Sequence, residues 1–316
     1  MIAYKQIVEQ IESRNKILII GHNNPDPDAI GAAGALLFFI ETYFPEKSAL
    51  IANVDAFPTN LHFLGIEKYS SALANIDLEK FDLIIVVDCG EISRTGIAEK
   101  LNDIKGKITT INIDHHERNI GFANINVVEQ ISSTCEIIFK ILKYNNYSLN
   151  KKISTCLLTG ITYDTAYFMN SATSKEAMAA SSELMKTAAD IRSIIRHTWK
   201  NKSADTLKLW GKVLEQLHFN KKYQVAVAVI PKEANIDPEI FNDLKNHYLQ
   251  YLNEVKFIIL IKESDDGFIN CSLRTNRDNI NVAKLAEKFG GGGHVKSAGF
   301  SINGSLEKTE TGWKIK

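Results

Sequence analysis

Acidic and imidazole side chains follow apolar runs at four separate places in this 316-residue chain. Asp114, His115 and His116 stand directly after "ITTINI", and Asp88 stands directly after "LIIVV". Carboxylates and imidazoles are side chains that bind transition-metal ions and transfer protons. The recurrence of this pattern predicts one shared site built from four parts of the chain. The members that follow the other two runs, "KILII" and "LLTGITY", are His22, Asp26, Asp28 and Asp164.

Four of these carboxylates in one partly buried cleft would repel one another strongly unless a cation lay between them. The four are Asp26, Asp28, Asp88 and Asp164. Mixed carboxylate and imidazole ligands suit manganese, zinc or iron(II) better than calcium, which prefers oxygen alone. Four carboxylates and two imidazoles are more ligands than one ion needs, and they suit two ions that share a bridging carboxylate. Such a pair of ions activates water at neutral pH and holds a phosphoryl group. The chemistry that this set predicts is hydrolysis of a phosphate ester.

Length and composition indicate a soluble globular protein of two domains. The chain is too long for one ordinary core, and 45% of its residues are hydrophobic and 23% charged. Lys and Arg together number 37, as do Asp and Glu, so no global field attracts a membrane or a long nucleic acid. The four cysteines are scattered singly, which is typical of reduced thiols. The N-terminus lacks a signal-peptide pattern, and we expect a cytoplasmic protein.

The first part of the chain alternates apolar strands with helices. We expect strands at 16–22, 48–53, 81–90 and 107–116, and a helix over 28–44. Nearly continuous apolar runs separated by helices predict an α/β fold with a doubly wound, mostly parallel sheet covered on both faces. Because ligands bind outside the carboxyl ends of such strands, the sheet would bring the acids and imidazoles to one edge.

A helical pattern over 174–218 separates this region from a second one. The second region begins with a strand at 223–230 and a helix at 238–255, and continues with an antiparallel hairpin. A helix over 281–289 then leads into "GGGGHVKSAGF". We therefore expect a smaller C-terminal α/β domain with a mixed sheet. The predicted boundaries are 1–190 for the catalytic domain, 191–215 for a helical linker and 216–316 for the second domain.

Four motifs in order, "HNNPDPDAIG", "VVDCG", "IDHH" and the acid of "TGITYD", resemble those of the DHH phosphoesterase family. "GGGGHVKSAG" resembles the signature of the DHH-associated C-terminal domain. Size and domain order are similar to the short members that act as oligoribonuclease and pAp phosphatase. The resemblance implies two divalent cations, with manganese expected, and two substrates. These are short RNA oligonucleotides, cut to mononucleotides, and 3′-phosphoadenosine 5′-phosphate (pAp), cleaved to AMP. A homodimer is compatible with this interpretation.

The resemblance also implies a role for each residue of the set. His22 and Asp26 would hold one metal, and Asp88 would bridge it to a second. His116 would face the substrate phosphate as a hydrogen-bond donor or general acid, so Asp88 and His116 carry the catalysis. Asp114 more readily orients the imidazoles than acts directly. The shell of the second metal would be completed by Asp28, His115 and Asp164.

One position departs from the family pattern. Family members usually have glycine where this chain has Pro27. Proline fixes φ near −65° and still fits a turn between two ligands. We therefore expect both flanking acids, Asp26 and Asp28, to keep their roles as ligands.

Several other residues are candidates for contact with the substrate, each with a structural alternative. Arg94 could meet a phosphate or be a solvated residue at a helix start. The glycine run of "GGGGHVKSAG" could let backbone N–H groups approach an anion. The structural alternative for this run is a helix C-cap followed by a turn. "SSTCEII", at 132–138, predicts a helix N-terminus with Glu136 as the reciprocal capping partner. The substrate-binding candidates in the second domain are Arg274, Gly291, Gly292, Gly293 and His294.

Three rival functions remain open at this point. The metal motifs are shared with pyrophosphatases and exopolyphosphatases, although the glycine-rich C-terminal segment argues against them. Hydrolysis of linear dinucleotides from cyclic-dinucleotide turnover is a close variant. A nucleotide-binding sensor without turnover is the alternative outside enzymes, and it would be expected to lack at least one ligand of the set.

Overall fold

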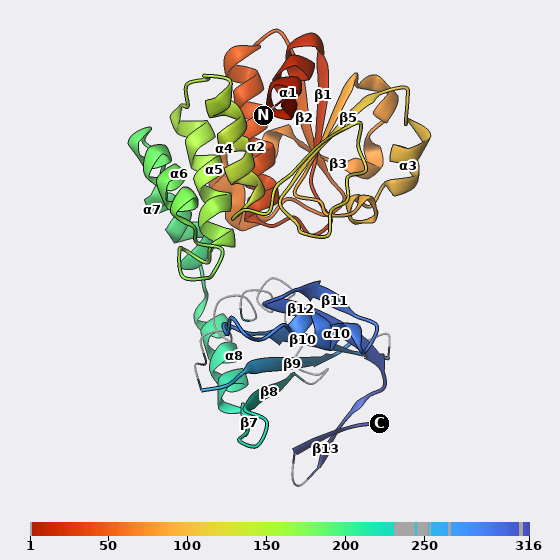
Figure 1. The fold of residues 1–316 in the computed structure, drawn as a ribbon, viewed down its shortest axis with the longest axis vertical. Helices are drawn as coiled ribbons and strands as arrows, with labels where there is room; N and C mark the ends of the chain where they lie inside the picture. The colour runs from red at the N-terminus through yellow and green to blue at the C-terminus, as the bar shows by residue number, and fades with distance from the viewer. Residues whose placement is uncertain (1, 231–243, 245–251, 253, 265–266, 310–311) are drawn as a thin grey trace. The chain divides into compact units, whose positions relative to one another are not determined.

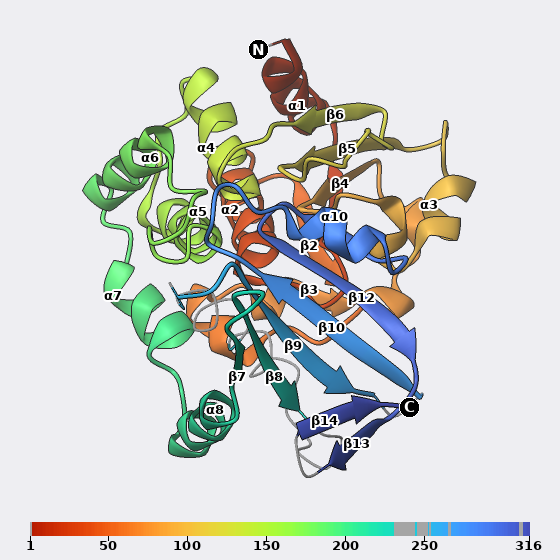
Figure 2. The same cartoon turned by 60° about the horizontal axis from the view of Figure 1, so that its bottom comes forward.

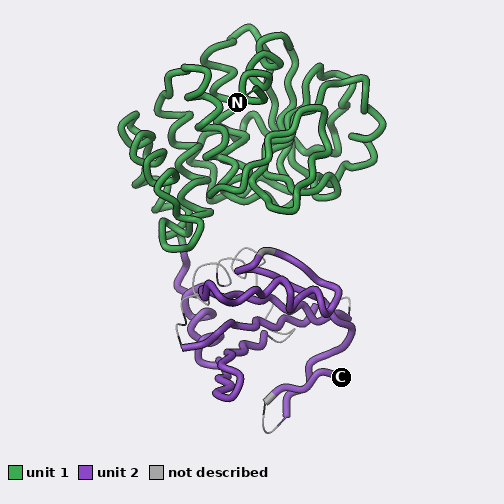
Figure 3. The backbone as a smooth tube through the Cα atoms, viewed as in Figure 1, with its two compact units in different colours: residues 1–201 green, residues 202–316 purple. Residues whose placement is uncertain are grey.

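The structure is a computed structural model that describes residues 2–230, 244, 252, 254–264, 267–309 and 312–316. The chain divides into two compact units, Met1–Asn201 and Lys202–Lys316 (Figure 3). The division falls within the charged stretch at 200–205 that follows the last helix of the first unit. Each unit contains its own sheet and its own apolar clusters, and each is described separately.

Unit 1 is built on a six-stranded sheet in which every neighbouring pair is parallel (Figure 1). The strand order is β3-β2-β1-β4-β5-β6, so the direction of winding reverses between β1 and β4. Ligands of open parallel sheets bind at such a reversal, outside the carboxyl ends of the strands. The strands are β1 Lys16–Ile20, β2 Ser48–Asn53, β3 Ser70–Ala72, β4 Leu83–Val87, β5 Thr109–Asp114 and β6 Ile125–Val128.

Helices cover both faces of this sheet, and the side chains of β1 show why. Ile17 and Ile19 pack into one apolar core, whereas Leu18 and Ile20 pack into another on the opposite face. Figure 1 shows α2, α4 and α5 on one side of the sheet and α3 on the other. The predicted doubly wound α/β fold is therefore confirmed. The helices of unit 1 are α1 Ile2–Ser13, α2 Pro27–Tyr43, α3 Ala98–Asp103, α4 Thr134–Tyr144, α5 Lys151–Asp164, α6 Lys175–Lys186 and α7 Ile191–Ile194, followed by a π-helical turn, Ile195–Trp199. Short 3-10 turns connect them at Thr59–Leu64, Glu67–Tyr69, Leu73–Asn75, Leu78–Lys80 and Ile92–Thr95.

Asp164 ends a helix, α5, and does not follow a strand of the sheet. The segment before it forms α5, although it is rich in threonine and isoleucine. The hydroxyls of Thr155, Thr159 and Thr162 donate to backbone carbonyls four residues earlier, which satisfies them inside the helix. Helix α5 lies against α2, and Gly31 makes the close approach possible, since a Cβ there would lie 2.5 Å from the carbonyl oxygen of Cys156.

Unit 2 contains a second six-stranded sheet, with strand order β11-β12-β10-β9-β8-β7. Among the described strands only β8 and β9 pair in parallel, so the sheet is mixed, as the sequence predicts (Figure 2). Helix α8 covers one face through Trp210 and Val213, and α10 covers the other through Val282 and Ala286. The elements are α8 Ala204–Glu215, β7 His218–Asn220, β8 Val225–Ile230, β9 Phe257–Glu263, β10 Phe268–Arg274, α10 Val282–Glu287, β11 Gly292–His294, β12 Ser297–Asn303, β13 Leu306–Thr309 and β14 Gly312–Ile315.

Two further sequence expectations concern unit 2 and membranes. Strands β9 and β10 form the predicted antiparallel hairpin. The helix expected over 238–255 lies almost entirely outside the described residues. Within the described ranges, no helix combines the length and the hydropathy that crossing a bilayer requires.

Candidate metal centre

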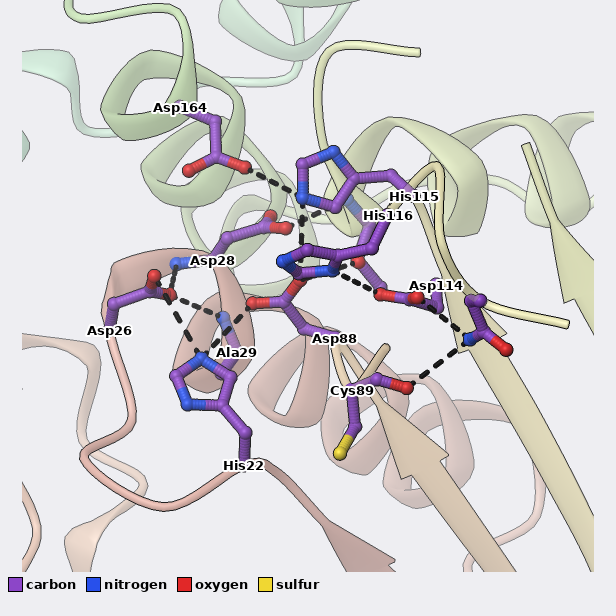
Figure 4. Close-up of polar contacts among 12 residues, drawn as sticks. His22, Asp26, Asp28, Ala29, Asp88, Cys89, Asp114, His115, His116 and Asp164 are labelled. Carbon is purple, nitrogen blue, oxygen red and sulfur yellow. Dashed lines mark hydrogen bonds and ion pairs between the residues drawn. The ribbon is translucent and has the colours of Figure 1, made fainter. Parts of the chain in front are cut away.

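Eight acidic and imidazole side chains meet at the carboxyl edge of the unit 1 sheet (Figure 4). Loops after β1 and β4 supply His22 and Asp88, on the two strands that flank the reversal of winding. The end of β5 supplies Asp114 and the two histidines that follow it, whereas Asp164 arrives from α5. Topology thus brings together residues that lie up to 142 positions apart in the sequence, from His22 to Asp164.

The first group of possible ligands consists of His22, Asp26 and Asp88, whose ligand atoms all lie within 4.8 Å of one another. His22 Nε2 lies 3.4 Å from Asp88 Oδ2 and 3.8 Å from Asp26 Oδ2. Two ligand atoms about 2.1 Å from one ion are separated by roughly 3–3.5 Å at ordinary coordination angles. The separation of 3.4 Å lies within this range and that of 3.8 Å slightly above it, so these side chains could enclose one cation.

The second group consists of Asp28, His115 and Asp164, and it satisfies the same 4.8 Å criterion. His115 Nε2 lies 3.3 Å from Asp164 Oδ2 and 3.5 Å from Asp88 Oδ1. The carboxylate of Asp88 therefore presents Oδ2 to the first group and Oδ1 to the second. That arrangement is the one a bridging carboxylate requires.

Backbone strain helps to place Asp88. Its φ is +54°, a left-handed value that is costly for a residue with a side chain. The conformation begins directly after β4, and the amide of Asp88 still donates to the carbonyl of Ile113 on β5 at 2.9 Å. The chain thus turns sharply at the strand end while the sheet holds the residue in register. Strain of this kind is characteristic of functional sites.

Hydrogen bonds orient both ligand imidazoles in the same way. Nδ1 of His22 donates to the carbonyl of Asn23 at 2.7 Å, and Nδ1 of His115 contacts the carbonyl of Ile131 at 3.3 Å. A carbonyl oxygen can only accept, so the proton lies on Nδ1 and the lone pair of the neutral ring lies on Nε2. Nε2 is the atom that faces the carboxylates in both cases. Metal-binding histidines are commonly held in this manner.

His116 is held differently, by the carboxylate of Asp114. Its Nδ1 lies 2.7 Å from Asp114 Oδ1, and Asp114 is completely buried. The other oxygen, Oδ2, accepts from Asn119 Nδ2 at 2.7 Å, and Asn119 also donates to Asn112. Burial alone would lower the pKa of His116, but the hydrogen bond to Asp114 and the negative charges of Asp88 and Asp114 together outweigh it, so the pKa is raised. The carboxylate of Asp114 therefore favours the protonated form of His116, the form that a general acid needs.

The carboxylates of the cluster are electrostatically crowded. Burial raises the pKa of Asp28 to about 7, and the nearby carboxylate of Asp88 adds to the effect. Burial also raises the pKa of Asp164, reinforced by the other acids. Burial opposes ionisation of Asp88 as well, but three neighbouring imidazoles outweigh it and hold its pKa well below its usual range. In the absence of other cations, protons must offset part of this negative charge.

The donor chemistry fits divalent cations on three counts. The carboxylate oxygens and imidazole Nε2 atoms converge within each group, the imidazole protons are held away on Nδ1, and the acids repel one another. Burial alone would lower the pKa of His22, but the carboxylates of Asp26 and Asp88 raise it to about 11. Without a metal, His22 is therefore cationic and has a second proton on Nε2, and a metal ion would bind this nitrogen by displacing that proton.

Asp26 and Pro27 begin helix α2. Oδ1 of Asp26 accepts from the amides of Asp28 and Ala29, so Asp26 is the N-cap, while Oδ2 faces His22. Pro27 occupies the first position of the helix, where a missing N–H costs nothing. The cap and the cluster therefore use different oxygens of one side chain. The substitution of proline for the usual glycine leaves both flanking acids within the cluster.

Two other sequence predictions concern the same edge of the sheet. Arg94 lies beside the first group, with Nη2 3.4 Å from Nδ1 of His22. The segment "SSTCEII" begins α4, and Ser133 is its N-cap, as predicted. The reciprocal bond differs by one residue, because Glu136 accepts from the amide and hydroxyl of Ser132.

The candidate substrate residues of unit 2 lie on neighbouring strands. Arg274 on β10 and His294 on β11 both pair with Ser297 on β12, although the His294 side chain lies outside the described set. The guanidinium of Arg274 donates to its own strand, to the carbonyl of Leu273 at 2.9 Å. Packing also requires glycine at 291 and 293, since a Cβ on Gly291 or Gly293 would lie 2.5 Å or less from the backbone of β12. Gly292 lies between them on β11.

Comparison with known families agrees with this architecture. Residues 16–161 match the N-terminal domain of the DHH family, and residues 220–311 match the DHHA1 domain. The chain thus contains a DHH domain followed by a DHHA1 domain. The metal-centre residues from His22 to His116 lie within the first match, and the strands that carry Arg274 and the glycines lie within the second.

Individual relatives match over nearly the full length. A Mycoplasma genitalium protein named bifunctional oligoribonuclease and PAP phosphatase NrnA is 28% identical, covering 94% of this chain and 92% of its own. The Thermus thermophilus protein of the same name is 26% identical, covering 91% and 84%. A crystal structure described as an exopolyphosphatase-related protein from Bacteroides fragilis has a TM-score of 0.85 and 25% identity, covering 96% of this chain and 92% of that one.

Three residues of the site were not singled out from the sequence for a role in it. Thr134 donates its hydroxyl to Asp88, Asn119 supports Asp114, and Gly160 leaves room for Asp28. Asn119 lies three residues after His116, so its proximity was a usable signal. Nothing local marks the other two, because they contact the cluster only through the packing of α4 and α5 against α2.

Proposed function

We propose that this protein is a metal-dependent phosphoesterase that hydrolyses short RNA oligonucleotides to mononucleotides and pAp to AMP. The observation that carries the proposal is the shared carboxylate of Asp88. Its Oδ2 faces the group that contains His22, and its Oδ1 faces the group that contains His115. Relatives named as oligoribonuclease and PAP phosphatase match both domains, which supports this choice of substrates.

Two divalent cations, with manganese as the proposed metal, would occupy the centre. His22, Asp26 and Asp88 would hold the first, and Asp28, His115 and Asp164 would share Asp88 to hold the second. Bound there, the cations would lower the pKa of a water molecule and neutralise charge on the phosphoryl oxygens. The mixed oxygen and nitrogen donor set favours manganese over calcium or magnesium.

The protein itself supplies proton transfer and orientation. Asp114 fixes the ring of His116 through Nδ1, so proton exchange with the departing oxygen falls to Nε2. Arg94, at the edge of the first group, would pair with a phosphate oxygen. In unit 2, Arg274, His294 and the glycines Gly291, Gly292 and Gly293 would bind the distal part of the nucleotide.

The reaction is proposed to take place in the cytoplasm, and the protein could act as a homodimer. All four cysteines are buried free thiols, which suits a reducing compartment. Equal numbers of acidic and basic residues support short substrates over long nucleic acids.

A single assay panel tests the proposal. The purified full chain is offered an RNA dinucleotide, an RNA five-mer, pAp, pyrophosphate and polyphosphate, each with manganese or with EDTA. We expect manganese-dependent release of mononucleotides from both RNAs and of AMP from pAp, with no turnover in EDTA. The panel includes the inorganic substrates because one structural relative is described as exopolyphosphatase-related. Turnover of pyrophosphate or polyphosphate alone would replace the proposed function with that one.

A further inference from the structure

The first turn of helix α4 contacts both groups of the metal centre. The amide of Thr134 donates to Asp28 Oδ2 at 2.7 Å, and the amide of Cys135 donates to Asp28 Oδ1 at 3.0 Å. The hydroxyl of Thr134 donates to Asp88 Oδ1 at 3.0 Å. One residue therefore holds a carboxylate of the second group through its backbone and the shared carboxylate through its side chain.

This turn is itself held firmly in place. Ser133 caps the helix by accepting from the amide of Glu136 at 3.0 Å. The carboxylate of Glu136 is 1% exposed and accepts from the Ser132 hydroxyl at 2.6 Å, with Lys140 Nζ 3.5 Å away. Thr134 and Ser133 are completely buried. The hydroxyl of Thr134 is thus positioned before any ligand arrives, and its direction does not depend on solvent.

The direction of the bond has a chemical consequence. Asp88 Oδ1 faces the second group, and a hydrogen bond to that oxygen fixes the rotation of the carboxylate between the two groups. Without the hydroxyl, the carboxylate of Asp88 could rotate. Its distances to His22 and to His115 would then no longer be fixed at the same time. Outer contacts of this kind commonly change metal affinity or activity 10–100-fold.

We infer that Thr134 is a positioning residue that couples the two cation groups by fixing Asp88 through its hydroxyl and Asp28 through its amide. This inference rests on the proposed function, because it concerns the same centre. It predicts that removal of the hydroxyl weakens both cation-binding steps, whereas the amide contact to Asp28 remains.

The test is a calorimetric titration of the full chain with MnCl₂, with the variants Thr134→Val, Thr134→Ser and Thr159→Val. Valine keeps the branched shape but removes the hydroxyl, and serine restores it. Thr159 is the matched control, since it is equally buried but its hydroxyl donates only within its own helix, to Thr155. Urea unfolding of each variant without metal establishes that it is folded.

Thr134→Val is expected to bind manganese about 10–100-fold more weakly in both steps. Thr134→Ser is expected to recover most of the affinity, and Thr159→Val to bind as the wild type does. Wild-type affinity in a folded Thr134→Val variant would overturn the inference and leave the proposed function standing. Equal weakening in Thr159→Val would also overturn it. A wild-type protein that binds no manganese would overturn the proposed function, and the inference with it.

Discussion

The two ligand groups of the centre are supported in different ways. The first draws His22 and Asp26 from one short loop after β1, and the Asp26 side chain is 35% exposed. The second draws Asp28, His115 and Asp164 from three distant segments, and Asp28 is completely buried. Apart from the shared Asp88, local sequence therefore defines the first group, whereas the second depends on the packing of α2 and α5 beside the end of β5.

This difference indicates what each group should tolerate. A change in the loop should alter one cation site and leave the fold intact, because the loop bears little of the core. A change at the helix contacts around Asp28 should alter cation binding and stability together. Asp88 belongs to both groups, so its loss should have the largest effect of all.

Asp88→Asn is expected to remove most activity, lowering turnover of pAp and of an RNA dinucleotide at least about 1000-fold. Asparagine keeps the volume but loses the charge that both groups share. Circular dichroism should show an intact fold, since the backbone position is held by β4 and β5. Retention of more than a tenth of the wild-type rate would remove Asp88 from the centre of the mechanism.

Gly160→Ala should damage the second group through sterics alone. A Cβ there would lie 2.2 Å from Asp28 Oδ1 and 2.4 Å from the sulfur of Cys135. We expect about 1–3 kcal/mol of destabilisation and weaker manganese binding, measured by urea unfolding and calorimetry. Gly211→Ala is the control, because that helix position is open and the change should stabilise by up to about 1 kcal/mol. If both variants behave alike, close packing at Gly160 does not support the centre.

The buried acid of the second group should make stability depend on pH. The pKa of Asp28 is about 7 in the folded protein, above its ordinary value of 3.8, so the fold binds this proton more tightly than the unfolded chain does. Protonated Asp28 therefore contributes to the free energy of unfolding of the metal-free protein at low pH, and this contribution should be lost as pH rises from about 4 to 7. Asp28→Asn cannot lose this proton, so its stability relative to the wild type should be higher at pH 8 than at pH 4, by up to about 4 kcal/mol. Thermal unfolding in EDTA at both pH values measures the difference, and a constant difference would contradict it.

Asp26→Asn should have the smallest effect and the most local one. Asparagine caps helices as well as aspartate does, so the free energy of unfolding should change by less than about 0.5 kcal/mol. The charge facing His22 is lost, and we expect one manganese-binding step to weaken about tenfold while the other is retained. Calorimetry that shows both steps weakened equally would mean that the two groups are not separable at this position.

The sequence predicts much of this centre because its ligands occur in short motifs at the ends of apolar runs. His22, Asp88 and His115 each follow a strand, and parallel topology alone brings strand ends to one edge. Asp164 was predicted as a member of the set, although it lies at the end of a helix and not after a strand. Family motifs identify the residue, whereas the position of α5 depends on its packing against α2.

The supporting contacts could not be predicted in the same way. Thr134 and Gly160 act on carboxylates more than 40 positions away, and nothing in their local sequence indicates those partners. The glycine-rich segment of unit 2 shows the reverse problem. Its pattern suggested anion binding, but Gly291 and Gly293 are also required by the backbone of β12, so composition alone does not separate the two causes.

The most direct test of the account is a crystal of the full chain grown with manganese and measured at the manganese absorption edge. The account predicts two anomalous peaks, one bounded by His22, Asp26 and Asp88 and the other by Asp28, His115 and Asp164, with Asp88 touching both. A single peak, or two peaks that Asp88 does not join, would contradict the shared carboxylate on which the proposed function depends.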